Sequence, residues 1–169
     1  MAQLIAYFSR AGENYVNGAI KNLAVGNTEI AAKMIAEIAD SDLFQIMPVN
    51  AYSDDYNECI SEAQDDQRRD ARPDLKEYPD SLDGYDTIYL GYPNYWGTMP
   101  MCVFTFLEHY DFTGKTIKPF CTHEGSGMGH SEADIRRLCP QVKVEKGLAI
   151  HGADVSHARK SIEKWIQSK

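Results

Sequence analysis

The chain has 169 residues, of which 43% are hydrophobic, and this is enough for one packed domain without metal or disulfide staples. Its 25 acidic and 17 basic residues give a formal net charge of -8, which disfavours nucleic acid as a partner. The four cysteines form no CxxC pair, and no apolar run approaches a membrane span in length. We therefore expect one domain over residues 1–169, with no leader peptide and no membrane partner, located in the cytoplasm.

Short apolar segments alternate with longer amphipathic ones along the chain. The short segments are typical of buried strands and occupy residues 4–8, 43–49, 87–92, 116–121 and 148–151. Apolar residues at helical spacing predict helices over residues 28–39, 99–110, 131–138 and 156–166, and polar residues 54–69 suit a solvated helix. Residues 71–85, which include Pro73 and Pro79, are expected to form an irregular surface connection.

This alternation predicts an α/β fold with a doubly wound parallel sheet. A parallel neighbour cannot be reached by a tight turn, so each crossover carries a helix and is nearly always right-handed. In such a sheet, ligands bind beyond the carboxyl ends of the strands. Three loops lie at that edge, and we expect the functional site there.

The first loop follows the first predicted strand and begins Ser9-Arg10-Ala11, and the first predicted helix opens at Asn27-Thr28. A helix N-terminus has unpaired amides and a partial positive charge, so these residues are candidates to hold a phosphate without a basic cluster. The alternative is that Asn27 or Thr28 only caps the helix.

The second loop follows the third predicted strand and reads Pro93-Asn94-Tyr95-Trp96-Gly97. A planar ring would stack on Tyr95 or Trp96, while Asn94 could reach the polar edge of that ring. The alternative is that Trp96 closes the core or faces a partner chain.

The third loop follows the fourth predicted strand and reads Thr122-His123-Glu124-Gly125-Ser126-Gly127, and its glycines would let the backbone approach a flat ligand. It is not a dinucleotide-binding GxGxxG loop, because the third glycine would fall at His130. His123 and Glu124 lack the HExxH spacing, so we expect no metal site.

With these three loops in order, the chain resembles the flavodoxin-like superfamily from Gln3 to Trp165. Residues 93–100, PNYWGTMP, are similar to a loop of flavodoxin-like NAD(P)H:quinone reductases, and residues 122–129 resemble their flavin loop. The resemblance implies a three-layer sandwich with strand order 2-1-3-4-5 and helices on both faces. It also implies one non-covalent FMN, with both loops against its isoalloxazine ring.

The first loop departs from the family pattern. Its two halves, Ser9-Arg10-Ala11 and Gly26-Asn27-Thr28, are separated by an insertion over residues 13–25. The insertion would bulge outward as a lid or partner surface if both halves bind one phosphate; otherwise Gly12-Glu13-Asn14 would supply the phosphate contacts. Ala11 also lacks the hydroxyl that the family often has, which removes about 1 kcal/mol of hydrogen bonding.

The resemblance implies electron transfer through the flavin to a redox partner protein, and the acidic surface favours a basic one. The alternative is an NAD(P)H-dependent quinone or flavin reductase with a small acceptor. Neither requires a dedicated catalytic residue. His151 follows the last predicted strand and could lie near the flavin or be structural.

Two further alternatives are a phospho-acceptor receiver domain and a domain that has lost its flavin. The receiver domain needs acidic residues where Ser9 and Pro93 stand, and only the split first loop motivates the loss of flavin. The oligomeric state stays open.

Overall fold

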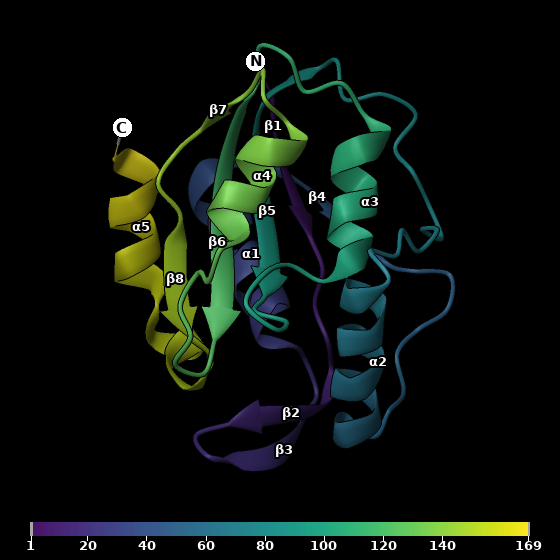
Figure 1. Cartoon of the computed structure of the whole chain (residues 1–169). Helices are drawn as coiled ribbons and strands as arrows, with labels where there is room; N and C mark the ends of the chain where they lie inside the picture. The colour runs from purple at the N-terminus through teal and green to yellow at the C-terminus, as the bar shows by residue number, and fades with distance from the viewer. Residues whose placement is uncertain (1, 169) are drawn as a thin grey trace.

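The computed structural model describes residues 2–168 and arranges them in three layers, with a parallel sheet between two groups of helices (Figure 1). The strands of the sheet are β1 (Ala2–Tyr7), β4 (Asp42–Gln45), β5 (Tyr85–Pro93), β6 (Thr116–His123), β7 (Lys143–Val144) and β8 (Leu148–His151). Their order is β4-β1-β5-β6, and both β7 and β8 pair with β6. In terms of the five predicted strands this order is 2-1-3-4-5, so the predicted fold and topology are confirmed.

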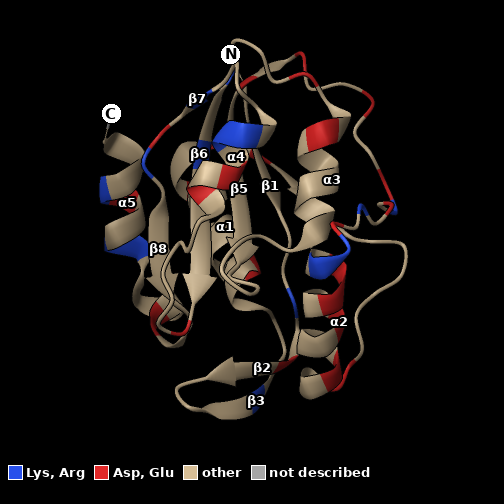
Figure 2. Cartoon of the chain, viewed as in Figure 1, with Lys and Arg blue, Asp and Glu red and all other residues tan. Residues whose placement is uncertain are grey.

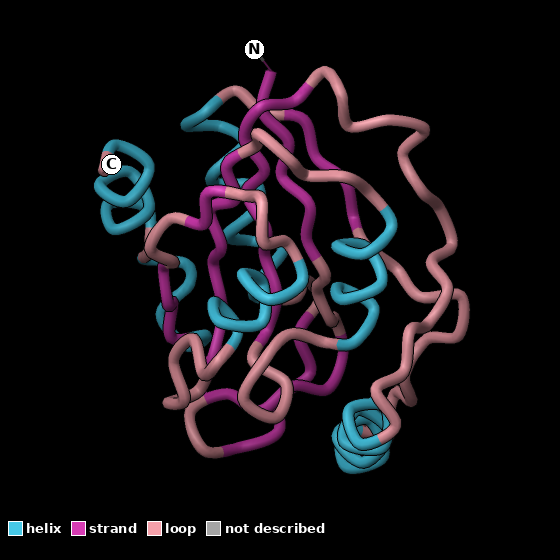
Figure 3. Tube along the Cα trace, turned by 45° about the horizontal axis from the view of Figure 1, so that its top comes forward, coloured by secondary structure: helices cyan, strands magenta, loops and turns pink. Residues whose placement is uncertain are grey.

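The residues of β1 alternate between two hydrophobic clusters, because successive side chains of a strand point to opposite faces. Leu4 and Ala6 belong to the cluster that includes α3 (Met101–His109) and α4 (Ser131–Leu138). Ile5 and Tyr7 belong to the cluster that includes α1 (Asn27–Ala39) and α5 (Arg159–Gln167). Figure 3 shows the strands lying between helices on either side. Burial on both faces explains the continuous apolar runs in the sequence.

Two predicted boundaries were wrong. The predicted strand over residues 43–49 ends at Gln45, because the chain turns at Pro48 and pairs there with the connection that includes Leu75. The predicted helix over residues 156–166 is divided into a 3-10 helix η1 (Gly152–His157) and α5, which starts at Arg159. The polar helix is α2 (Tyr56–Arg68), and its N-cap Asp55 accepts a hydrogen bond from Glu58 N at 2.9 Å.

The insertion forms a β-hairpin of β2 (Gly12–Val16) and β3 (Ala19–Leu23), which pair only with each other. Its turn residues Asn17 and Gly18 have φ of 55° and 84°, the left-handed values that a two-residue hairpin turn requires. In Figure 1 the hairpin lies beyond the carboxyl ends of the sheet strands, below the body of the protein. It therefore stands beside the edge where the site is expected.

Gly91 in β5 gives a sharp test of packing beneath this edge, because the Phe120 ring of the neighbouring strand covers it. A Cβ on Gly91 would stand 2.2 Å from Phe120 Cζ, and Phe120 is fully buried. We expect Gly91→Ala to lower the free energy of unfolding by about 1–3 kcal/mol through overpacking. Urea denaturation should show a smaller cost in a Phe120→Leu background, and an equal cost in both backgrounds would contradict this packing.

Candidate functional site

A cavity of about 430 Å³ lies at the carboxyl ends of β1, β5 and β6, and this volume is within the range of small-molecule sites. Most of the predicted site residues meet there. Those that line it are Arg10, Asn27, Thr28, Pro93, Asn94, Tyr95, Trp96, Gly97, Thr122, His123, Glu124 and Ser126. The three loops therefore converge on one space.

The remaining predicted residues do not line the cavity and act at its margin. Ser9 Oγ accepts a hydrogen bond from Glu29 N at 3.0 Å, so it caps the first turn of α1. Gly127 O accepts from Asn94 Nδ2 at 2.9 Å, which ties the second loop to the third. Ala11 and Gly125 are exposed beside the lining residues.

The N-terminus of α1 forms the end of the cavity that is suited to bind an anion such as phosphate. Ile30 N donates to Gly26 O, and Glu29 N donates to Ser9 Oγ, so the amides of Asn27 and Thr28 have no partner among residues 2–168. The Thr28 and Thr122 hydroxyls are 2.8 Å apart and buried, which fixes this turn against β6. The helix is thus capped by Ser9 rather than by Asn27 or Thr28, and its first amides remain available to an anion.

The second loop forms a tight turn in which Tyr95 and Thr98 pair and Trp96 and Gly97 are the central residues. Trp96 has φ of 55° and Gly97 φ of 91°, values that suit glycine or asparagine but are strained for tryptophan. Trp96 is 45% exposed, and its Nε1 donates to Ile60 O of α2 at 2.8 Å. It therefore does not close the core but lies at the cavity wall, bonded to α2.

Helix α2 supplies a wall that the sequence analysis missed. Tyr56, Cys59, Ile60 and Ala63 line the cavity, and their spacing of three, four and seven residues places them on one face of the helix. This apolar stripe within an otherwise polar helix was the signal that could have revealed the wall. The outer face of α2 is acidic (Figure 2), with Glu58, Glu62 and Asp65 exposed.

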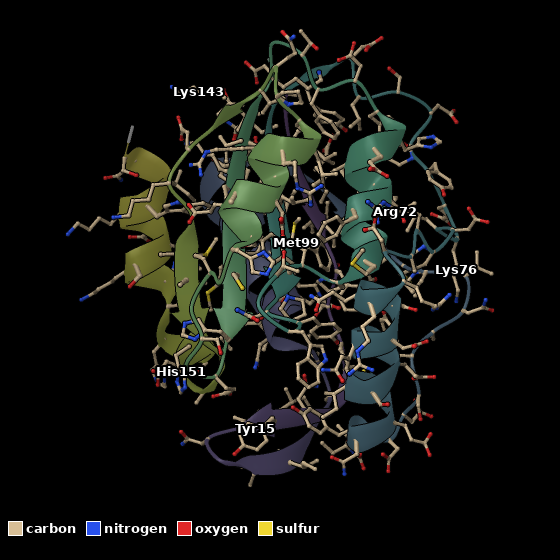
Figure 4. All side chains as sticks on the ribbon, in the orientation of Figure 1. Tyr15, Arg72, Lys76, Met99, Lys143 and His151 are labelled. Atoms are coloured by element: carbon tan, nitrogen blue, oxygen red, sulfur yellow. The ribbon has the colours of Figure 1, made fainter. Side chains whose placement is uncertain are left out.

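The hairpin is joined to α2 across the mouth of the cavity. Tyr15 stacks on Tyr56 with ring centroids 6.2 Å apart, and Glu13 Oε1 accepts from Tyr56 N at 2.6 Å. Asn14 and Tyr15, which belong to the insertion expected to form a lid or partner surface, both line the cavity. Figure 4 shows Tyr15 on the hairpin and His151 at the end of β8, both at this end of the molecule. The insertion therefore covers part of the site.

Arg10 is the only lysine or arginine among the lining residues that the structure describes. Its Nε donates to Glu13 O at 2.9 Å, and its Nη2 donates to Asp54 O at 3.1 Å. Because both acceptors are neutral carbonyls, the positive charge of Arg10 is not paired with a carboxylate in this arrangement. The guanidinium holds the base of the hairpin to the chain before α2.

His151 does not line the cavity, but it contacts Glu124 of the third loop, which does. Its Nε2 lies 2.9 Å from Glu124 Oε2, and its Nδ1 lies 3.5 Å from Asp154 Oδ2. The His123 ring is 5.8 Å away, and burial, followed by the neighbouring His151, lowers the pKa of His123. Gly152, which follows His151, also lines the cavity and was missed.

No group of three or more His, Cys, Asp or Glu side chains is arranged to hold a metal ion within residues 2–168. None of the helices in the same range combines the length and the apolar composition needed to cross a bilayer.

Comparisons with known proteins match this architecture. The family model described as Flavodoxin matches residues 2–169. A provisionally assigned flavoprotein from Bacteroides uniformis is 30% identical, with 99% of this chain and 98% of that chain covered and a TM-score of 0.78. A second one, from Bacteroides eggerthii, is 26% identical over 95% and 97% of the two chains, with a TM-score of 0.73.

A more distant structure shows the fold alone. A flavoprotein from Lactobacillus acidophilus, solved in complex with FMN, is 20% identical over 92% of this chain and 97% of that chain, with a TM-score of 0.64. No curated protein matches the chain.

Gly97 should be sensitive to substitution because of its backbone conformation. An alanine at this position would have to adopt φ of 91°, and its Cβ would stand 3.4 Å from the His130 ring. We expect Gly97→Ala to destabilise the protein by about 1–2 kcal/mol. Gly84 is the matched control, because its φ is not positive and nothing lies within 4 Å of its Cβ position. Equal changes for the two variants in thermal or urea denaturation would contradict the assigned turn.

The cysteines should be unreactive in the folded protein. Burial raises the pKa of Cys121 to about 12 and that of Cys139 to about 11, and it also raises the pKa of Cys59 and Cys102. At pH 8 the nucleophilic thiolate is therefore scarce. Mass spectrometry after iodoacetamide treatment should show slow labelling of the native protein and rapid labelling in urea; rapid native labelling at any of the four would contradict the burial.

Proposed function

The chain belongs to the flavodoxin family, and from this premise we propose that it binds one FMN non-covalently in the cavity and transfers electrons through it. One observation carries the proposal: unpaired amides at the N-terminus of α1 and the aromatic Tyr95-Trp96 turn border the same cavity. A helix N-terminus suits a phosphate, and an aromatic wall suits a planar ring. The FMN complex of the Lactobacillus acidophilus protein, which shares the fold, is consistent with this assignment.

The residues present fit FMN at both ends. The amides of Asn27 and Thr28 would receive the phosphate, and Arg10 would add positive charge at the same margin. Trp96 and Tyr95 would contact the ring, while the glycine-rich turn after Thr122 would bring backbone amides to its polar edge. When bound, FMN supplies the redox chemistry, and the protein sets access and electrostatics around it.

The acceptor of the electrons is a second part of the proposal. The acidic outer face of α2 adjoins the cavity wall, so a basic redox partner protein would be attracted to that side. We place the activity in the cytoplasm, where the four cysteines would remain free thiols.

The alternative is an NAD(P)H-dependent quinone or flavin reductase, and the hairpin favours it. Tyr15 and Tyr56 form an aromatic pair at the cavity mouth, which suits a small planar acceptor better than a protein surface. Rapid oxidation of NADPH or NADH with a soluble quinone would support the reductase. Fast reduction of a basic cytochrome, slowed by salt and without quinone turnover, would support the carrier.

Flavin titration tests the proposal directly. The purified, folded protein should quench the fluorescence of added FMN at one-to-one stoichiometry. Trp96→Ala should weaken FMN binding by about 1–2 kcal/mol, and Tyr95→Ala by a similar amount, because each removes an aromatic contact. Leu43→Ala is the control: Leu43 is 44% exposed, as Trp96 is 45% exposed, but lies on the edge strand β4 away from the cavity.

Two results would count against this assignment. Absence of FMN binding by the folded wild-type protein would remove the proposed cofactor. Normal FMN affinity in both aromatic variants would leave the cofactor in place but remove the aromatic turn from the binding site.

A further inference from the structure

A carboxylate lies at the end of the cavity where the phosphate would bind. Glu124 Oε2 is 2.9 Å from His151 Nε2 and accepts a weak 3.5 Å hydrogen bond from Asn17 N at the hairpin turn. The other oxygen, Glu124 Oε1, is buried and has no hydrogen-bond partner within residues 2–168. Half of this carboxylate is therefore desolvated without compensation, which is costly for a charged group.

Gly152 shows where this carboxylate lies. A Cβ on Gly152 would stand 2.6 Å from Asn27 Nδ2 and 3.0 Å from Glu124 Oε1. The ends of these two side chains therefore both lie next to Gly152. Asn27 is the first residue of α1. Glu124 therefore lies beside the first turn of α1, the turn whose free amides would receive the phosphate.

Two anions would then share one helix N-terminus. The partial positive charge at the start of a helix is about half an elementary charge, which favours one nearby anion but cannot neutralise two. A phosphate bound at Asn27 and Thr28 would be repelled by an ionised Glu124 unless a proton is added to the pair. His151, in contact with Glu124, is the group placed to take that proton, since histidine changes charge between pH 5 and 8.

We propose that Glu124 and His151 make recognition of the flavin phosphate proton-dependent, so that the cavity prefers FMN over riboflavin more strongly when His151 is protonated. The inference rests on the proposed FMN site. With a proton on His151 the pair is neutral and the phosphate is accepted. With a neutral imidazole the pair carries one negative charge, and the phosphate is opposed.

The other titratable groups near the pair do not replace His151 in this role. Burial and His151 lower the pKa of His123, and its Nδ1 already accepts a 2.9 Å hydrogen bond from Gly125 N, so protonation of His123 is disfavoured. Asp154 lies 3.5 Å from His151 Nδ1 on the far side from Glu124 and is 76% exposed.

The other charged groups on the elements packed around the pair are present in every protein that the test compares. Glu29 in the first turn of α1 is paired with Lys33 at 2.7 Å. Arg10 donates to Glu13 O and Asp54 O at the base of the hairpin, and its positive charge would support the phosphate equally in all of these proteins. Burial, and to a smaller extent the charge of Glu124, raises the pKa of the Tyr56 hydroxyl on α2. Tyr56 therefore stays neutral over this pH range.

The test compares the affinities of FMN and riboflavin, which differ only by the phosphate. Dissociation constants of both flavins are measured by fluorescence quenching between pH 6 and 8, for the wild type, Glu124→Gln and His151→Gln. The ratio of the two constants at each pH reports phosphate recognition and needs no turnover. The FMN phosphate also changes its charge near pH 6. Comparing proteins at the same pH cancels this contribution.

The expected results have opposite directions for the two variants. Relative to Glu124→Gln at the same pH, the preference of the wild type for FMN falls as pH rises from 6 to 8. Glu124→Gln raises this preference at pH 8 by about tenfold, the effect of removing a unit charge several ångströms away near a protein surface. His151→Gln lowers the preference at pH 6 below that of the wild type at the same pH, because the carboxylate then stays uncompensated.

Glu163→Gln on α5 is the matched control, because it removes a carboxylate whose one ion-pair partner among residues 2–168 is Arg159, outside the cavity lining. It should leave the ratio at every pH unchanged. A ratio at pH 8 that is the same in Glu124→Gln and in the wild type would overturn the inference. So would an unchanged ratio at pH 6 in His151→Gln. If the folded wild type binds both flavins with the same ratio as the two variants at every pH, the inference alone fails; if it binds neither flavin, the proposed function fails with it.

Discussion

The site depends on how the first turn of α1 is held against the sheet. A Cβ on Gly26 would stand 2.2 Å from Ser9 Oγ and 2.5 Å from Arg10 O, so only glycine allows the chain to enter the helix this close to the end of β1. Ser9 then caps Glu29 N, and the buried contact between Thr28 and Thr122 joins the same turn to β6. Because the helix is fixed at both points, its free amides are held in a fixed position at the cavity.

Around this fixed turn the other elements meet the cavity with different degrees of constraint. The Trp96-Gly97 turn carries backbone strain, which is tolerated because Trp96 Nε1 and Gly97 N both have hydrogen-bond partners, Ile60 O and Asn94 Oδ1. The hairpin is held by the exposed stack of Tyr15 on Tyr56 and a few polar contacts. The site thus combines a firmly held N-terminus of α1, a strained Trp96-Gly97 turn and a hairpin that is attached by few contacts.

Most of the fold was predictable because each buried strand is a short apolar run and each helix has one apolar face. The site edge followed from topology, since the ends of β1, β5 and β6 must lie together in a parallel sheet. The wall made by α2 was not foreseen, because the polar composition of that helix concealed the stripe from Tyr56 to Ala63. The hairpin was missed although Asn17-Gly18, between two short alternating segments, is a strong turn signal. The pairing of Glu124 with His151 joins the loop after β6 to the end of β8, and no local pattern encodes it.

The independence of the hairpin has a consequence for how such a site can diversify. Its strands pair with each other and with no strand of the main sheet. Changes in the length of the hairpin or in its side chains therefore leave the register of the main sheet unchanged. Natural variation at this one position could therefore retune what reaches the cavity while the scaffold stays constant. The same property makes the Asn17-Gly18 tip a natural grafting point for loops or reporter segments.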